Sequence, residues 1–211
     1  MGNVLSNQQI ADFAQRGFVS PVALLDQAYC DLLLQRISSF QSRRPGDVPW
    51  AFDIKCNLLF DWVYQLSMHT GTLDAVEDLL GPNLYNTDTV FRIKEPGAPT
   101  AYGWHQDAAR IDVDPCFLIV YVALTESSPE NGGLSVIPGS HKSILPFEVR
   151  ENHDGQAMRK VARTLDVCED QAVALTLLPG QATIFSGRLV HGSGPNPSST
   201  RRVSILTDYT A

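Results

Sequence analysis

Several features that mark other protein classes are missing from this sequence of 211 residues. No stretch approaches the ~18 uninterrupted apolar residues of a membrane-spanning helix. The N-terminus lacks the basic and apolar regions of a secretory signal. Acidic residues outnumber basic ones, 23 to 16, for a net charge of −7, whereas nucleic-acid binding needs a basic surface. We therefore expect neither a membrane protein nor a nucleic-acid-binding protein.

Clustered cysteines are missing as well. The four cysteines, Cys30, Cys56, Cys116 and Cys168, are scattered and form no Cys-x-x-Cys pair. Zinc sites and disulfide frameworks need closer or more regular spacings. Buried free thiols in a reducing compartment explain the pattern better, so we expect a cytoplasmic protein.

The first part of the chain, residues 1–82, has mainly helical patterns. Ser6 and Gln9 have the spacing of a capping box, and Gly17 suits the end of the helix that they begin. Ser20-Pro21 is predicted to start a second helix, because proline favours the first helical position. Thr72 is predicted to cap a short fourth helix. The predicted helices cover residues 6–16, 20–40, 58–68 and 72–81.

The second part, residues 83–211, contains short apolar or alternating segments separated by glycine and proline turns. The segment 116–124 is a long run of β-branched and aromatic residues, typical of a buried strand. The other predicted strands are 90–93, 134–137, 172–177, 182–185 and 203–209. Helices followed by many short strands indicate a single α+β domain, mainly β, over residues 1–211. We expect a jelly-roll or cupin-like barrel with the helices packed on one outer face.

The polar segment 143–166 interrupts this series of strands. Long insertions of this kind are often lids over active sites. A plain surface loop explains the composition equally well, and both interpretations stay open.

The segment Trp104-His105-Gln106-Asp107 carries the first chemical indication. Residues two apart on a strand share a face, so His105 and Asp107 would present an imidazole beside a carboxylate. Two histidines and one carboxylate form the facial triad that holds non-haem iron(II). His191 is the best candidate for the third ligand, because a jelly roll brings distant strands together. Taken alone, a His-x-Asp pair is more often a surface or core feature.

Arg202 adds an independent argument. A guanidinium beside a metal can bind a carboxylate through a two-pronged contact that lysine cannot make. The pocket would then suit a dicarboxylic acid, chelated at one end and paired with Arg202 at the other. Ser193 lies two residues after His191 and could add a hydrogen bond. The alternative is that Arg202 is a surface residue like its neighbour Arg201.

Together these motifs resemble the phytanoyl-CoA dioxygenase family of iron(II)/2-oxoglutarate-dependent oxygenases. The matching segments occur in the family's order and extend over roughly residues 5–210. They are Leu79-Leu80-Gly81-Pro82-Asn83, Lys94-Glu95-Pro96-Gly97, Trp104-His105-Gln106-Asp107, Ala123-Leu124-Thr125, Glu130-Asn131-Gly132-Gly133, Ile137-Pro138-Gly139-Ser140-His141, and His191-Gly192-Ser193-Gly194 with Arg202. The resemblance implies a double-stranded β-helix, which is a jelly-roll variant.

The resemblance also implies residue roles. The implied iron ligands are His105, Asp107 and His191. The implied 2-oxoglutarate site consists of Arg202, Ser193, Tyr121, Phe91 and Lys55. Arg202 rather than Arg201 matches the family's arginine, because it lies eleven residues after His191. The other histidines, His69, His141 and His153, are not expected to be ligands, and His69 and His153 are expected to be exposed.

The implied function is hydroxylation of a small-molecule metabolite with iron(II), 2-oxoglutarate and dioxygen, releasing succinate and carbon dioxide. Related halogenases replace the carboxylate ligand with a small residue, so Asp107 indicates hydroxylation rather than chlorination. Two alternatives stay open. One is a cupin-type metal-dependent isomerase, epimerase or lyase that uses no 2-oxoglutarate, against which Arg202 and Ser193 speak. The other is a non-catalytic relative that binds a small molecule, which the intact triad disfavours.

Overall fold

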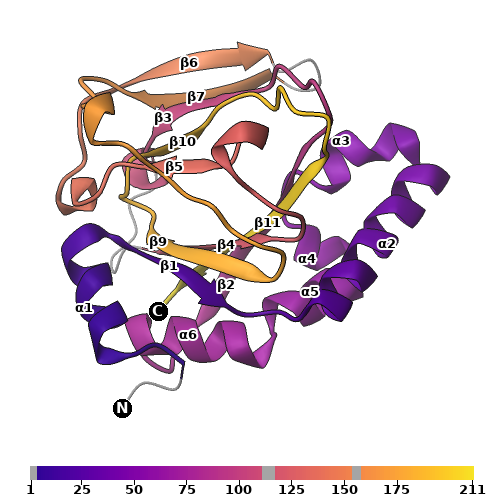
Figure 1. Cartoon of the computed structure of the whole chain (residues 1–211), viewed down its shortest axis with the longest axis horizontal. Coiled ribbons are helices and arrows are strands. Elements are labelled where there is room, and N and C mark those ends of the chain that lie inside the picture. Colours follow the sequence, from indigo (N-terminus) through magenta and orange to yellow (C-terminus); the bar gives the residue numbers. More distant parts are fainter. Residues whose placement is uncertain (1–3, 111–116, 154–157) are drawn as a thin grey trace.

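The computed structural model describes residues 4–110, 117–153 and 158–211. Helices occupy most of the N-terminal third and strands most of the remainder (Figure 1). The α-helices are α1 (Asn7–Arg16), α2 (Gln27–Arg43), α3 (Val48–Ala51), α4 (Cys56–Leu59), α5 (Asp61–Ser67) and α6 (Thr70–Leu80). The strands are β1 (Phe18–Ala23), β2 (Tyr85–Lys94), β3 (Tyr102–His105), β4 (Leu118–Ala123), β5 (Leu134–Val136), β6 (Phe147–His153), β7 (Met158–Thr164), β8 (Val173–Ala174), β9 (Gln181–Ser186), β10 (His191–Ser193) and β11 (Arg202–Thr210).

Two antiparallel sheets form the barrel. The larger has the strand order β1-β9-β4-β11-β2, and the smaller has the order β3-β10-β5-β8. The helices lie on the outer side of the larger sheet, and β6 and β7 form a separate pair at the opposite end of the molecule (Figure 1). This is the predicted jelly roll with helices on one outer face.

The central strand β4 explains why the chain needs a long apolar run. Its residues alternate between two apolar clusters, one shared with the helices and one shared with the smaller sheet. The first set is Leu118, Val120 and Val122, and the second is Ile119, Tyr121 and Ala123. A strand covered on both faces has no polar alternation. Each large aliphatic side chain buried there contributes about 1.5–3 kcal/mol, so β4 anchors both layers.

The first predicted helix is confirmed by α1. Ser6 and Gln9 form the capping box, and Gly17 adopts a left-handed conformation (φ 86°) at the C-terminus. The predicted start of the second helix is wrong. Ser20 and Pro21 belong to the edge strand β1, which pairs with β9. The apolar residues of this segment face the helices from the strand β1. The helix α2 therefore starts later, with Asp26 as its cap.

The other helical boundaries also differ from the predictions. The helix predicted over 58–68 is two helices, because Phe60 adopts an extended conformation between α4 and α5. The cap of α6 is His69 rather than Thr72, although the helix ends before Gly81 as predicted. The second helix also ends later than the predicted residue 40, since α2 continues to Arg43.

The segment 143–166 is not a plain loop, since β6 and β7 pair antiparallel over seven residues each. We call β6 and β7 together the hairpin. The predicted strands are otherwise found, although β8 is shorter than 172–177. Cys116, predicted to start the buried strand, lies outside the described residues.

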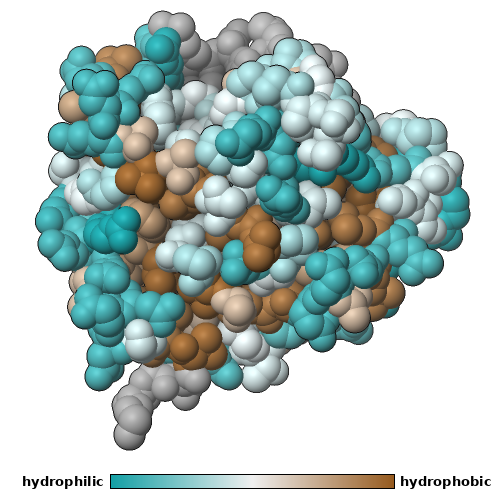
Figure 2. Space-filling view, viewed as in Figure 1, coloured by the Kyte–Doolittle hydropathy of each residue, from teal (hydrophilic) through white to brown (hydrophobic). Residues whose placement is uncertain are grey.

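The surface is mixed in character. On the face seen in Figure 2, hydrophilic side chains gather at the periphery, and hydrophobic ones show through the central and lower part. Among the described helices, none is both long and apolar enough to cross a membrane.

Candidate active site

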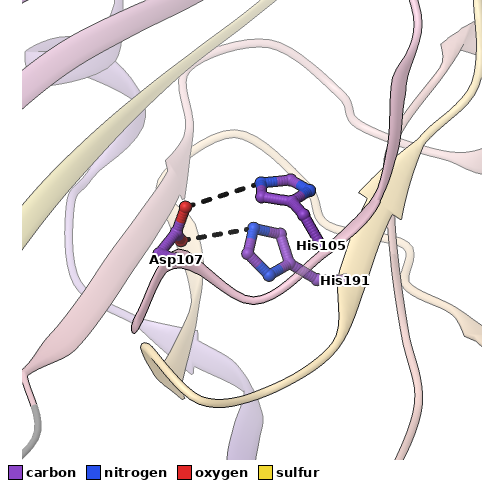
Figure 3. Close-up of side chains that lie close together, drawn as sticks. All are labelled: His105, Asp107 and His191. Carbon is purple, nitrogen blue, oxygen red and sulfur yellow. Dashed lines mark ion pairs between the residues drawn. The ribbon is translucent and has the colours of Figure 1, made fainter. Parts of the chain in front are cut away.

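Three side chains predicted as metal ligands converge at one end of the smaller sheet. His105 ends β3 and His191 begins β10, and the two are direct partners across these strands. Their ring centroids lie 4.1 Å apart. Asp107 faces both rings (Figure 3), with Oδ1 3.5 Å from His105 Nε2 and Oδ2 3.5 Å from His191 Nε2. One ligand atom from each residue lies within 4.8 Å of the other two.

The predicted reason for this geometry needs a correction. Asp107 does not share a strand face with His105, because β3 ends at His105 and Asp107 begins a short 3-10 helix (Asp107–Arg110). The turn is fixed by Gln106, which is fully buried. Its side-chain amide donates to Ser143 O (2.9 Å) and accepts from Leu145 N (2.9 Å). The residue between the two ligands therefore ties the site to the base of the hairpin.

The histidine tautomers suit metal binding. His105 Nδ1 lies 2.7 Å from Gly103 O, and His191 Nδ1 lies 3.0 Å from Leu189 O. A carbonyl oxygen can only accept, so each Nδ1 carries the hydrogen. In the neutral ring, each Nε2 then presents a lone pair toward the space beside Asp107. Backbone carbonyls commonly orient metal-ligating histidines in this way.

The electrostatics also suit a cation. Burial would raise the pKa of Asp107, but His191, His105 and Arg92 hold the pKa of that carboxyl well below its usual range. Burial and the neighbouring His105 lower the pKa of His191 to about 4. Burial alone would lower the pKa of His105, but the Asp107 carboxylate and the Gly103 carbonyl raise it above its ordinary value. At neutral pH the site offers a carboxylate and a neutral His191, which fits a divalent metal.

The pocket beside the three side chains ends at Arg202. Arg202, Tyr121 and Ser193 line it together with His105, Asp107 and His191. The guanidinium of Arg202 is 1% exposed. Its Nη1 donates to Tyr121 Oη and to Ser204 Oγ (3.1 Å), while Nε is buried without a hydrogen-bond partner. Arg202 therefore presents unused donors in a buried place, which suits a carboxylate.

Arg201 behaves differently, as the spacing predicts. Its side chain is 26% exposed and pairs with Glu95 at 2.9 Å. It also donates to Gln41 Oε1 at 2.7 Å. The two neighbouring arginines thus have separate surroundings, one in the pocket and one at the surface.

Two residues predicted for the 2-oxoglutarate site are not brought to the pocket. Phe91 faces the helices, where its ring packs against Phe52 and Trp62 at centroid distances of 4.9 and 5.6 Å. The residue of β2 that lines the pocket is Arg92, on the opposite face of the strand. Lys55 is held elsewhere, since its Nζ donates to Thr87 O at 2.6 Å on an exposed edge of β2. The alternation along β2 could have excluded Phe91.

Some residues that line the pocket had no predicted role, and the remaining histidines lie elsewhere. Tyr102, Leu134, Gly192 and Leu206 also line the pocket. His141 contacts Ala14 O through Nε2 (3.3 Å), consistent with a structural role. His69 was expected to be exposed, but it is half-buried and stacks on Tyr29. The side chain of His153 lies outside the described part of the chain.

A family model described as phytanoyl-CoA dioxygenase matches residues 13–204. The chain belongs to this family. A probable alpha-ketoglutarate-dependent hypophosphite dioxygenase of Stutzerimonas stutzeri is 33% identical over 162 residues, which cover 74% of this chain and 55% of that protein. An ectoine dioxygenase of Sphingopyxis alaskensis is 29% identical over 153 residues, covering 65% of this chain and 50% of that one. The chain spans about half the length of the curated relatives that it matches.

Solved structures of other proteins have the same fold. The non-heme monooxygenase ThoJ in its apo form superposes with a TM-score of 0.84 at 28% identity, over 96% of this chain and 77% of that one. EctD from S. alaskensis, with 2-oxoglutarate and 5-hydroxyectoine, superposes with a TM-score of 0.76 at 21% identity, over 100% and 78%. The second likeness supports the fold alone.

Proposed function

We propose that this protein is an iron(II)- and 2-oxoglutarate-dependent oxygenase that hydroxylates a small molecule, with release of succinate and carbon dioxide. The observation that carries the proposal is the convergence of His105, Asp107 and His191 beside a pocket that ends at Arg202. Three protein ligands on one side of a metal leave positions open for other groups. The buried arginine then suits the far carboxylate of a dicarboxylic acid.

Each residue has a role that its surroundings support. The Nε2 atoms of the two histidines and the Asp107 carboxylate would hold iron(II). Arg202 and Ser193 would bind the C5 carboxylate of 2-oxoglutarate, and Tyr121 would hold the guanidinium in place through its hydroxyl. Bound iron and 2-oxoglutarate would supply the oxygen-activating chemistry with dioxygen. The protein orients these groups and keeps water from them.

The comparisons support the same class of reaction. The relatives include a probable alpha-ketoglutarate-dependent hypophosphite dioxygenase and an ectoine dioxygenase, and both names refer to small molecules. We infer a small-molecule substrate here, one domain over residues 1–211, and a hairpin that covers the pocket. The described cysteines Cys30, Cys56 and Cys168 are free thiols, which supports a reducing compartment such as the cytoplasm.

Anaerobic reconstitution with iron(II), followed by 2-oxoglutarate and air, tests the proposal. Succinate should form, and dioxygen should be consumed, only when both iron(II) and 2-oxoglutarate have been added. A chelator should stop both. Iron binding without any succinate would favour a metal-dependent isomerase, epimerase or lyase. Failure of the folded protein to bind iron(II) would favour a non-catalytic small-molecule-binding protein.

A further inference from the structure

Lys94 is a buried lysine next to a buried arginine. It lies at the end of β2, directly opposite Arg202 on β11. Both side chains are 1% exposed. Within the described ranges, neither forms an ion pair with a carboxylate. Burying two positive charges together is costly unless a function or a set of oxygen atoms offsets it.

Oxygen atoms surround the Lys94 amine. Its Nζ donates to Ser193 Oγ (2.8 Å), to Gly132 O (3.3 Å) and, in a short contact, to Gly194 O. Ser193 O is 3.5 Å away. Carbonyl oxygens only accept, so they take up two hydrogens of the amine. The ammonium form supplies the third hydrogen to Ser193 Oγ.

The neighbouring backbone is shaped for this contact. Gly132 has a φ of +74°, and a Cβ added there would lie 2.5 Å from Pro195 O and 2.6 Å from Gly194 O. The turn before β5 can approach the segment after β10 only without a side chain. Burial, and then the charge of Arg202, lower the pKa of Lys94 to about 7. Because burying two positive charges together is costly, the set of oxygen atoms around Lys94 indicates a function beyond filling space.

The contact decides which way Ser193 can act. With Lys94 as an ammonium, the form that a carboxylate bound beside Arg202 favours, the hydroxyl accepts from Lys94 and keeps its own hydrogen for another partner. Among the described residues, no acceptor for that hydrogen is found. Ser193 lines the pocket together with Arg202, whereas Lys94 lies behind it. The hydrogen of Ser193 is therefore left to donate to a molecule in the pocket.

We propose that Lys94 is a positioning residue for the cosubstrate: it holds the Ser193 hydroxyl as an acceptor, so that Ser193 donates to the carboxylate that Arg202 binds. The inference rests on the proposed function, since the carboxylate is the C5 group of 2-oxoglutarate. Lys94 acts through Ser193 and does not touch the ligand.

Binding measurements on the manganese(II)-loaded protein test this without turnover. Lys94→Met removes the donor and keeps an unbranched side chain. It should weaken 2-oxoglutarate binding about 10- to 100-fold, the range for a lost hydrogen bond to a charged group. Affinity for manganese(II) should stay within about twofold, because the metal ligands are unchanged. Ser193→Ala should cause a similar loss.

The double variant Lys94→Met/Ser193→Ala decides between positioning and general packing. If Lys94 acts through Ser193, the double variant binds 2-oxoglutarate no more weakly than the single variant with the lower affinity. A fold-loss in 2-oxoglutarate affinity equal to the product of the two single-variant losses would contradict the proposal. Lys94→Gln, which keeps a donor, should recover part of the affinity and also serves if the methionine variant does not fold. The exposed Lys142→Met is the matched control and should change nothing.

A second ligand separates this inference from the proposed function. Pyruvate offers the same 2-oxo acid group but has no distal carboxylate. Its affinity should be equal in the wild type and in Lys94→Met. An equal loss for pyruvate and 2-oxoglutarate would overturn the positioning role. A wild-type protein that binds manganese(II) but neither acid would instead overturn the proposed function.

Discussion

Replacing Arg202 should weaken 2-oxoglutarate binding far more than replacing Arg201. The guanidinium of Arg202 is buried, with its Nη1 fixed by Tyr121 and Ser204 and its Nε without a partner. Removing one partner of a buried charge pair costs about 3–5 kcal/mol. At about 1.4 kcal/mol per factor of ten, Arg202→Ala should weaken binding roughly 10²- to 10⁴-fold.

Arg202→Lys should recover only part of this affinity. Lysine keeps the charge but loses the planar fork, and it cannot reproduce both contacts to Tyr121 and Ser204. Arg201→Ala is the matched control. Its partly exposed pair with Glu95 contributes at most about 1 kcal/mol to stability and nothing to the pocket.

The assay is calorimetric titration of the manganese(II)-loaded variants with 2-oxoglutarate. Manganese(II) affinity is measured first, and it should be nearly the same in all variants. Loss of 2-oxoglutarate binding in Arg201→Ala together with its retention in Arg202→Ala would refute the role of Arg202. Arg202→Ala that binds both metal and cosubstrate as tightly as the wild type would refute it as well.

Three further predictions follow from the same structure. Phe91→Leu should lower the free energy of unfolding by about 1 kcal/mol, measured by chemical denaturation. It should leave 2-oxoglutarate affinity unchanged, because Phe91 packs among helix residues. A loss of 2-oxoglutarate affinity would show that Phe91 contributes to the pocket. Burial, with Asp107 and Asp88, raises the pKa of Asp208 well above its usual range, so the folded state loses stability as pH rises above about 4. In metal-free protein, Asp208→Asn should therefore raise Tm at pH 7, and this gain should vanish toward pH 4; an equal gain at both pH values would contradict the assignment. The hairpin contacts β3 and the 3-10 turn that holds Asp107, so deleting 152–158 should leave metal and 2-oxoglutarate binding intact but raise succinate release without a primary substrate. Unchanged succinate release would show that the hairpin is no cover.

The sequence predicted the architecture well because its signals were local and strong. The capping box at Ser6 and the continuous apolar run of β4 each have one simple structural solution. Ser20-Pro21 misled because proline suits both a helix start and an edge strand. Only pairing with the distant strand β9 decides between these, and no local pattern records that pairing.

The sequence predicted which three side chains converge at the candidate metal site, but not how the backbone brings them together. Strand parity suggested that His105 and Asp107 share a face, whereas a turn held by the buried Gln106 brings them together. Parity did hold along β2, where it places Arg92 rather than Phe91 in the pocket. The cradle around Lys94 could not be foreseen, because it is built from backbone oxygens of two distant turns.

Anaerobic titration with iron(II) tests the central claim most directly. The wild type should bind one iron(II) per chain, and His191→Ala and Asp107→Ala should lose that binding while circular dichroism and Tm show a retained fold. His141→Ala is the matched histidine control, since its imidazole lies outside the pocket lining, and it should bind iron(II) as the wild type does. Full iron(II) affinity in both triad variants, or its loss in His141→Ala alone, would contradict the account.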